Sequence, residues 1–221
     1  MKKFISIFKK LRADQSGMAL IEFAYTLPIL VPMAMWGGEL ANYATVKMRV
    51  SQVALQIADN GSRIGEGSVL ASKQVTEANI NDILTGAGLQ ASTLNIYTNG
   101  RVYVSSVEPV ANPNTTARYK IVWQRCRGAG GQPSVYGQQG DTNLTGIGPT
   151  GRKATAPDTG KVIFAQVSYT YQPLFGATWS PPVNMTEIAA MLVRDQRFSG
   201  LPSQIAGVTP SGPITASGAC T

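Results

Sequence analysis

The chain has 221 residues, of which only 14% are charged, so it is long enough for one globular domain and too apolar for a disordered polyelectrolyte. Histidine, the commonest general base and metal ligand, is absent, and two cysteines are too few for a four-thiolate zinc site. The composition therefore argues against an enzyme, and we expect neither a cofactor nor a bound metal.

Residues 1–17 form a basic leader. Five basic residues face a single acid, Asp14, so the leader carries +4 of the formal net charge of +7 and leaves +3 for the rest of the chain. No basic stripe with interleaved aromatic residues follows, which argues against a nucleic-acid-binding face, and we expect no nucleic-acid partner. The basic residues of the leader are Lys2, Lys3, Lys9, Lys10 and Arg12.

Residues 18–36 are an apolar stretch with one charged residue, Glu22. A helix of this length spans about 28 Å, close to the hydrocarbon thickness of a bilayer, so the lipid bilayer is the expected partner. Positive charge before the stretch orients the N-terminus to the cytoplasm. A cleaved secretory signal peptide fits less well because no Ala-x-Ala site follows, and a buried soluble helix would leave the basic flank unexplained.

The junction of leader and apolar stretch, Gly-Met-Ala-Leu-Ile-Glu-Phe over residues 17–23, resembles the cleavage site of type IV pilin-like prepilins. Together with the following Ala-Tyr-Thr-Leu-Pro-Ile-Leu, it is similar to TadE-like pseudopilins of the tight-adherence (Tad/Flp) pilus system. The resemblance covers residues 12–32. It implies that a prepilin peptidase cuts the chain between Gly17 and Met18 on the cytoplasmic side of the membrane.

The resemblance further implies a minor pilin-like subunit that acts in the biogenesis, priming or tip of a Tad-type adhesive pilus. Its partners would be other pilin-like subunits and the inner-membrane assembly platform, with a surface or receptor ligand if the subunit lies at the tip. The protein would be a single-pass bacterial inner-membrane protein with a periplasmic C-terminal domain. An unprocessed single-span periplasmic scaffold or binding protein of an envelope secretion machine is the alternative.

Glu22 is an ionisable group near one end of the expected membrane helix, which costs roughly 2–3 kcal/mol and calls for a partner. Cleavage would free an ammonium on Met18, four residues before Glu22, so the two charges meet within one subunit or between neighbours in a fibre. Phe23 completes this assembly motif. A glutamate that merely snorkels to the helix end is the alternative. Pro28 and Pro32 predict a kink in the helix.

Residues 37–60 continue the helix with an apolar seam that recurs in steps of three and four, and Asn60-Gly61 predicts its end. We expect one helix over residues 18–59 whose second half packs on a sheet; a self-associating coiled coil is the alternative. The seam consists of Tyr43, Val46, Val50, Val53 and Ile57.

Residues 61–221 are expected to form the periplasmic domain, opening with a Gly- and Ser-rich linker over residues 61–73. A helix is predicted over Gln74–Thr85, ended by Gly86 and Gly88. Asn99-Gly100 predicts a type I′ hairpin. The result is an α+β, pilin-like fold in which the long N-terminal helix packs on an antiparallel meander of about five strands. The strands are predicted at residues 94–98, 101–104, 119–124, 162–171 and 187–194.

The last of these strands also follows from the resemblance, since TadE-like chains end in a strand with a terminal arginine, here Arg194. A long Gly-rich loop over residues 127–161 lies between the third and fourth strands. In a periplasmic domain Cys126 and Cys220 would be oxidised to a disulfide that tethers the tail Ser199–Thr221 beside the third strand, a gain of roughly 4–5 kcal/mol. Two unrelated free thiols are the alternative.

Overall fold

The computed structural model describes residues 16–67, 73–130, 133–177, 180–195, 208–209 and 220. The chain forms two compact units, Met1–Ala44 with Pro173–Pro181, and Thr45–Gln172 with Pro182–Thr221. Most of the basic leader lies outside the described residues. The predicted domain limits at residues 36 and 60 remain predictions.

The first unit is built on helix α2, which runs over Ser16–Arg63 and belongs to this unit as far as Ala44. Residues 18–36 contain no glycine, and the Met, Ala and Leu residues among them favour a helix. Among the described residues, this is the one helix that is long and apolar enough to cross a membrane. The expected long N-terminal helix is therefore confirmed, and it passes its predicted end at residue 59.

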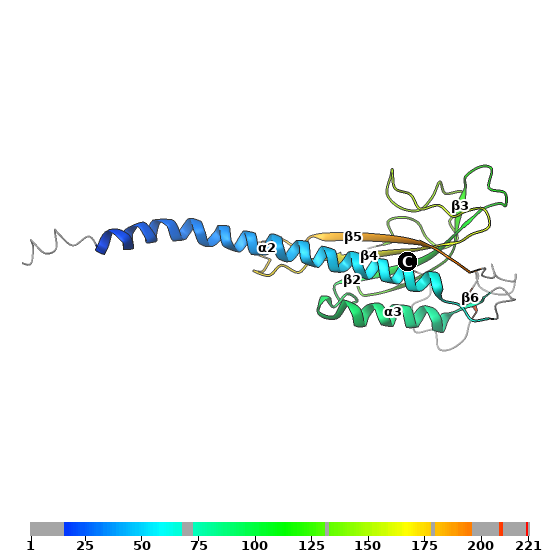
Figure 1. Ribbon diagram of the computed structural model, residues 1–221, viewed down its shortest axis with the longest axis horizontal. Coiled ribbons are helices and arrows are strands. Elements are labelled where there is room, and N and C mark those ends of the chain that lie inside the picture. Colours follow the sequence, from blue (N-terminus) through cyan, green and yellow to red (C-terminus); the bar gives the residue numbers. More distant parts are fainter. Residues whose placement is uncertain are drawn as a thin grey trace, which may run out of the picture. The chain divides into compact units, whose positions relative to one another are not determined.

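The second unit contains a four-stranded antiparallel sheet in the order β3-β2-β4-β5 (Figure 1). The α+β class is confirmed, but five strands and a meander are both wrong. Because β4 pairs with β2 rather than with β3, the chain from β3 to β4 must pass over β2. The strands are β2 (Gly100–Pro109), β3 (Tyr119–Arg127), β4 (Val162–Thr170) and β5 (Asn184–Leu192).

The strand predicted at residues 94–98 is a 3₁₀ turn, η1 (Ser92–Leu94), followed by an irregular turn, so the Asn99-Gly100 hairpin is also wrong. Asn95 adopts a left-handed conformation, and its carbonyl accepts the backbone N–H of Thr98 and of Asn99 at 2.9 and 3.0 Å. Leu94 and Ile96 are both buried. The alternating apolar pattern thus comes from two side chains that fill the core from a turn.

Helix α3 spans Glu77–Ala91, later than the predicted 74–85. It begins with a capping box, because the Thr76 hydroxyl accepts the Asn79 N–H and the Asn79 side chain accepts the Thr76 N–H. Gly86 and Gly88 lie inside this helix rather than ending it. At Gly88 a Cβ would lie 2.5 Å from the Tyr97 ring, so this glycine makes room for a side chain.

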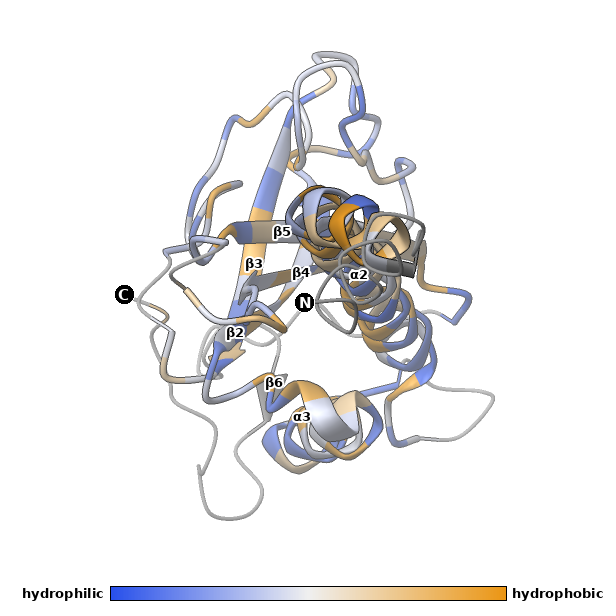
Figure 2. Ribbon diagram, turned by 90° about the vertical axis from the view of Figure 1, so that its left-hand side faces the viewer, coloured by the Kyte–Doolittle hydropathy of each residue, from blue (hydrophilic) through white to orange (hydrophobic). Residues whose placement is uncertain are grey.

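Within the second unit, α2 and α3 cover the same face of the sheet (Figure 2). Val50, Val53 and Ile57 of the predicted seam are buried, and Gly61 of α2 lies against Ile163 of β4. Docking of this half of α2 on the sheet is therefore confirmed. The segment predicted as a linker over residues 61–73 begins inside the helix, which ends only at Arg63.

An ion pair fastens α3 to the same face of the sheet. Arg125 of β3 donates from Nε to both carboxylate oxygens of Glu77, at 3.0 and 3.1 Å, and both side chains are 7% exposed. Arg125 also donates to the carbonyl of Gln124 and to the side chain of Gln139. Because its donors are largely satisfied, the buried guanidinium is tolerated there.

The Gly-rich segment predicted as a loop covers the opposite face of the sheet. Backbone bridges join Tyr119 to Leu144 and Ile147 to Ala154, which fold the segment back on itself and on β3. Its length therefore has a structural reason, since it supplies the second apolar layer. The buried cluster under it consists of Val107, Tyr119, Ile121, Ile147, Ala156, Val162 and Phe164.

Cys126 and Cys220 form a disulfide with a Cα–Cα distance of 5.6 Å, which confirms the predicted pairing. Most of the tail Ser199–Thr221 lies outside the described residues. Within it, β6 (Val208–Thr209) pairs in parallel with β1 (Val75–Thr76), the residues directly before α3. Residues 208–209 and 220 are thus joined to the rest of the second unit by backbone pairing and by a covalent bond.

Candidate processing and assembly site

Gly17 and Met18 lie in the first turn of α2, and both are exposed. A Cβ built at Gly17 would meet no heavy atom within 4 Å, so no contact in the described chain requires a glycine there. A glycine weakens a helix by about 1 kcal/mol relative to alanine. The Gly17–Met18 bond therefore lies where the helix is easily opened to an extended conformation.

Glu22 is exposed one helical turn after Met18, and i,i+4 spacing places the two side chains on the same face of α2. Among the residues that the structure describes, Glu22 makes no ion pair or hydrogen bond. The uncut chain has a peptide nitrogen at Met18, which carries no charge. The predicted pair between Glu22 and a free Met18 ammonium therefore remains a prediction.

Phe23 is 64% exposed, and its carbonyl accepts the hydroxyl of Thr26 at 3.2 Å. Pro28 and Pro32 both lie inside α2, which continues through them without a break. Each proline lacks an N–H, so the carbonyl four residues earlier loses its helical partner. A kink at these residues stays a prediction.

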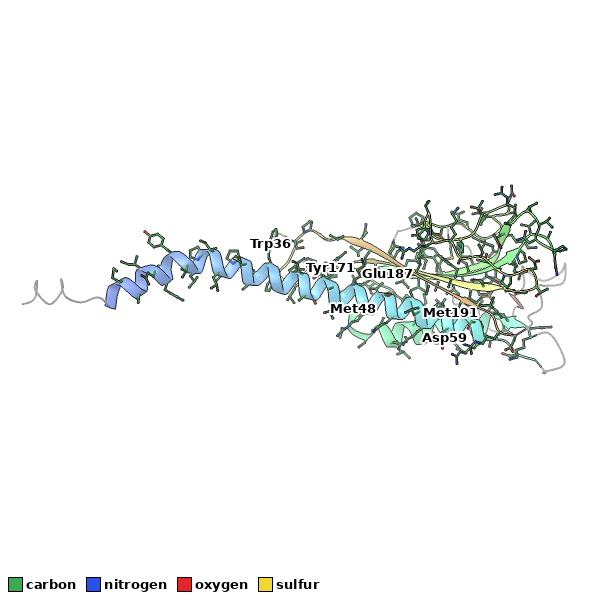
Figure 3. All side chains as sticks on the ribbon, turned by 45° about the horizontal axis from the view of Figure 1, so that its top comes forward. Trp36, Met48, Asp59, Tyr171, Glu187 and Met191 are labelled. Atoms are coloured by element: carbon green, nitrogen blue, oxygen red, sulfur yellow. A yellow bond between two sulfur atoms is a disulfide. The ribbon has the colours of Figure 1, made fainter. Side chains whose placement is uncertain are left out.

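Every residue from 17 to 31 is exposed, although most of these side chains are apolar. Apolar surface of this extent on a soluble monomer is unusual and marks a membrane or protein contact. Trp36 points outward from α2 in Figure 3, with 65% of its surface exposed. The first half of α2 therefore presents a surface that needs an apolar partner.

Sequence reasoning missed Glu39, the next acid after Glu22. Its carboxylate accepts the backbone N–H of Leu174 at 3.1 Å and of Phe175 at 3.3 Å. This ties the segment Pro173–Pro181 to α2 within the first unit. Glu39 and Leu174 are 135 positions apart in the sequence. The only signal in the sequence was therefore the apolar pair Leu174-Phe175 between two prolines.

The groove between this segment and α2 has a volume of about 220 Å³. Its walls are mainly apolar, and Glu39 is the charged residue among those that line it. The remaining lining residues are Met35, Trp36, Leu40, Phe175, Ser180 and Pro181.

The second unit holds further ionisable groups. Among the described residues, no three His, Cys, Asp or Glu side chains gather in a way that would hold a metal ion. Burial raises the pKa of Tyr97 to about 12, although Arg127 and a backbone hydrogen bond act in the opposite direction. Burial also raises the pKa of Tyr169. The folded state therefore favours the neutral form of both phenols, as expected of side chains that pack rather than react.

No family model matches this chain, and comparison with curated proteins and with solved structures finds no match either.

Proposed function

We propose that this protein is a minor pilin-like subunit, a pseudopilin, that acts in the biogenesis, priming or tip of a Tad-type pilus after cleavage by a prepilin peptidase. One observation carries the proposal. The basic leader ends at a glycine that no contact in the described chain requires, and this glycine lies in the first turn of a helix whose residues 17–31 are mostly apolar, all exposed, and include a single acid, Glu22, five places after the glycine.

The exposed half of α2 supports this proposal because a fibre subunit uses one apolar helix surface for two successive contacts. Before assembly the surface contacts lipid, and after assembly it contacts neighbouring subunits. Glu22 is costly in either apolar environment unless it meets a positive charge. Cleavage after Gly17 creates that charge on Met18, so the cut would switch the helix from an anchor into an assembly element with a defined axial register.

The second unit supports the proposed location. Its disulfide suits an oxidising compartment such as the periplasm. The basic leader favours a cytoplasmic N-terminus, which places residues after the membrane span on the other side. In this proposal the folded domain is presented in the periplasm, where it contacts other subunits of the assembly machinery.

The test uses a bacterium that makes such pili, with its own copy of this gene deleted and replaced by variants. Wild type is expected to yield mature protein that begins at Met18, measured as intact mass from purified membranes. Gly17→Val is expected to stay full length, because a branched side chain occupies the cleavage position. Gly37→Val is the matched control, since Gly37 is also exposed in α2 with no atom within 4 Å of its Cβ position, and it is expected to be cut normally.

Glu22→Gln separates processing from assembly in the same strains. It is expected to be cleaved like wild type but to leave the cells without surface pili. Thr26→Val, one turn later and similar in size, is expected to be cleaved and piliated. Full-length wild-type protein in cells with an active peptidase would overturn the proposal and leave the alternative of an unprocessed periplasmic scaffold.

A further inference from the structure

The segment Pro173–Pro181, which the structure describes apart from residues 178 and 179 and which we call the strap, carries two large apolar side chains with exposed surface. Leu174 is 61% exposed and Phe175 is 39% exposed. Their position is not that of a loose loop, since the Glu39 carboxylate binds the backbone N–H groups of both residues. The Ser180 N–H donates to the Gly176 carbonyl at 3.3 Å and closes a turn within the strap.

The helix beside the strap exposes apolar side chains as well. Trp36 is 65% exposed and Leu40 is 66% exposed. With Phe175 they line the groove of about 220 Å³ between helix and strap. An ordered, exposed apolar patch of this kind marks a contact with an apolar partner.

The place of the groove along the chain indicates which partner. It begins at Met35 and Trp36, where the apolar stretch 18–36 ends. A helix rises 1.5 Å per residue, so Trp36 lies about 21 Å along α2 from Glu22. If α2 crosses a bilayer, the groove lies where the helix leaves the hydrocarbon, and tryptophan is enriched at that level.

We propose that the strap is a second membrane-contacting element, which seats Leu174 and Phe175 in the interface of the bilayer leaflet that α2 leaves at Trp36. Upper acyl-chain segments of phospholipids occupy the groove. This inference rests on the membrane anchoring in the proposed function. Glu39 is a positioning residue, because its carboxylate fixes the strap backbone so that both apolar side chains face lipid.

The contact fixes how deep α2 lies in the membrane. An apolar helix alone can slide or tilt by a few ångströms at modest cost. A strap held by Glu39 adds a second apolar contact with the bilayer interface beside the helix. This contact opposes movement of α2 either deeper into the bilayer or out of it. The depth of Glu22 near the opposite end of the span is then fixed as well.

The test is site-specific fluorescence quenching on the full chain in vesicles of phosphatidylcholine and phosphatidylglycerol. The two native cysteines are joined in a disulfide, so one introduced cysteine can be labelled selectively with an environment-sensitive fluorophore. Leu174→Cys labels the strap and Leu30→Cys labels the expected membrane span. Leu89→Cys, 79% exposed on α3, is the control for an exposed leucine outside the first unit. Lipids carry a nitroxide either near the headgroup or near the bilayer centre.

The strap label is expected to be quenched more strongly by the nitroxide near the headgroup than by the central one, whereas the Leu89 label is quenched by neither. In the Glu39→Ala background the Leu174 label is expected to lose most of its quenching while the Leu30 label keeps its own. A quenched Leu30 label beside an unquenched Leu174 label overturns the strap inference and keeps the membrane span. An unquenched Leu30 label overturns the membrane anchoring itself.

A protein partner would give a different result. If a second copy of this chain covered the strap, the Leu174 label would shift to a blue emission that depends on protein concentration, without quenching by either lipid. That outcome also overturns the inference. Equal quenching at Leu174 with and without Glu39 overturns the positioning role of the carboxylate.

Discussion

Both halves of α2 carry apolar side chains, but these side chains are buried in one half and exposed in the other. In the second half Val50, Ala54 and Ile57 are buried by the chain's own sheet. In the first half the residues from 17 to 31 are all exposed. The same helical geometry therefore serves one half that completes a domain and another half whose apolar partner has to come from outside the described chain.

The difference lies in what each half faces rather than in helix propensity. A buried Ile or Leu side chain contributes about 1.5–3 kcal/mol when it leaves water. The second half gains this stabilisation within its own chain, beneath β4 and β5. The first half gains it only against an apolar partner from outside the described chain, which in the proposed function is lipid before assembly and a neighbouring subunit after it.

The largest expected effect on stability comes from removing the disulfide. This change alters the second unit alone, so it tests whether the first half of α2 is independent of that unit. The bond closes a chain segment of 94 residues, which corresponds to about 4–5 kcal/mol of loop-closure free energy. We expect Cys126→Ser/Cys220→Ser to lower the free energy of unfolding by that order. Urea unfolding in detergent micelles, followed by the fluorescence of buried Trp123, measures it.

The same double variant is expected to remain in the membrane fraction like wild type, because the exposed half of α2 is unchanged. Loss of membrane association together with stability would show that the two halves of α2 depend on each other.

A pair of isoleucines in α2 tests the comparison directly. Ile57 is 1% exposed and Ile29 is 66% exposed. Ile57→Ala is expected to lower the free energy of unfolding by about 2–5 kcal/mol, through lost burial and a cavity under the sheet. Ile29→Ala is expected to change it by less than about 0.5 kcal/mol. Urea unfolding of both variants in the same micelles gives the two values, and equal losses would contradict the assignment of the two halves.

Alanine substitutions at two glycines in α3 are expected to change the free energy of unfolding by smaller amounts and with opposite signs. At Gly88 a Cβ would lie 2.5 Å from the Tyr97 ring, whereas at Gly86 it would meet no atom within 4 Å. Gly88→Ala is expected to destabilise by about 1–3 kcal/mol through overpacking. Gly86→Ala is expected to stabilise by up to about 1 kcal/mol through helix propensity. Thermal unfolding curves of both variants decide the signs, and stabilisation by both would place Tyr97 elsewhere.

These glycines also show how far the sequence could predict the fold. Long periodic patterns predicted α2 almost to its ends, and alternating β-branched runs located β3 and β4 closely. The disulfide was predictable because only two cysteines exist to pair. Gly86 and Gly88 were interpreted as helix ends because a sequence pattern does not show the ring of Tyr97, which comes from a turn six residues after the helix.

Features that depend on distant contacts were not predictable in this way. Leu94 and Ile96 alternate like a strand, although they fill the core from a turn, because burial from a turn and burial from a strand leave the same pattern. The strand order β3-β2-β4-β5 was not predicted either, because β4 pairs with the edge of β2 that β3 leaves free, and a local sequence pattern does not show this pairing. In the candidate site, Gly17 and Glu22 followed from a local motif, whereas Glu39 did not, since Leu174 and Phe175 lie 135 and 136 residues away.

Tyr97 gives the smallest expected effect, and it again belongs to the second unit alone. Its hydroxyl donates to the Leu84 carbonyl, its ring lies 4.9 Å from the Arg127 guanidinium carbon, and burial raises its pKa from 10.0 to about 12. A raised pKa means that the folded state favours the neutral phenol. The stabilisation is therefore complete below about pH 10, where the phenol is neutral in both states, and is lost as the pH rises from about 10 to about 12.

We expect wild type to lose about 1 kcal/mol relative to Tyr97→Phe over this range, since water partly screens the half-buried ring. Below pH 10 the variant is less stable by a constant amount, about 1 kcal/mol for the missing hydrogen bond. Urea unfolding of both proteins at a series of pH values measures the difference, in which lysines and Tyr169 cancel because both proteins contain them. Curves that stay parallel through about pH 11 would mean that Tyr97 titrates alike in the folded and unfolded states, and the packing of the turn against α3 would have to be looser than the contact at Gly88 indicates.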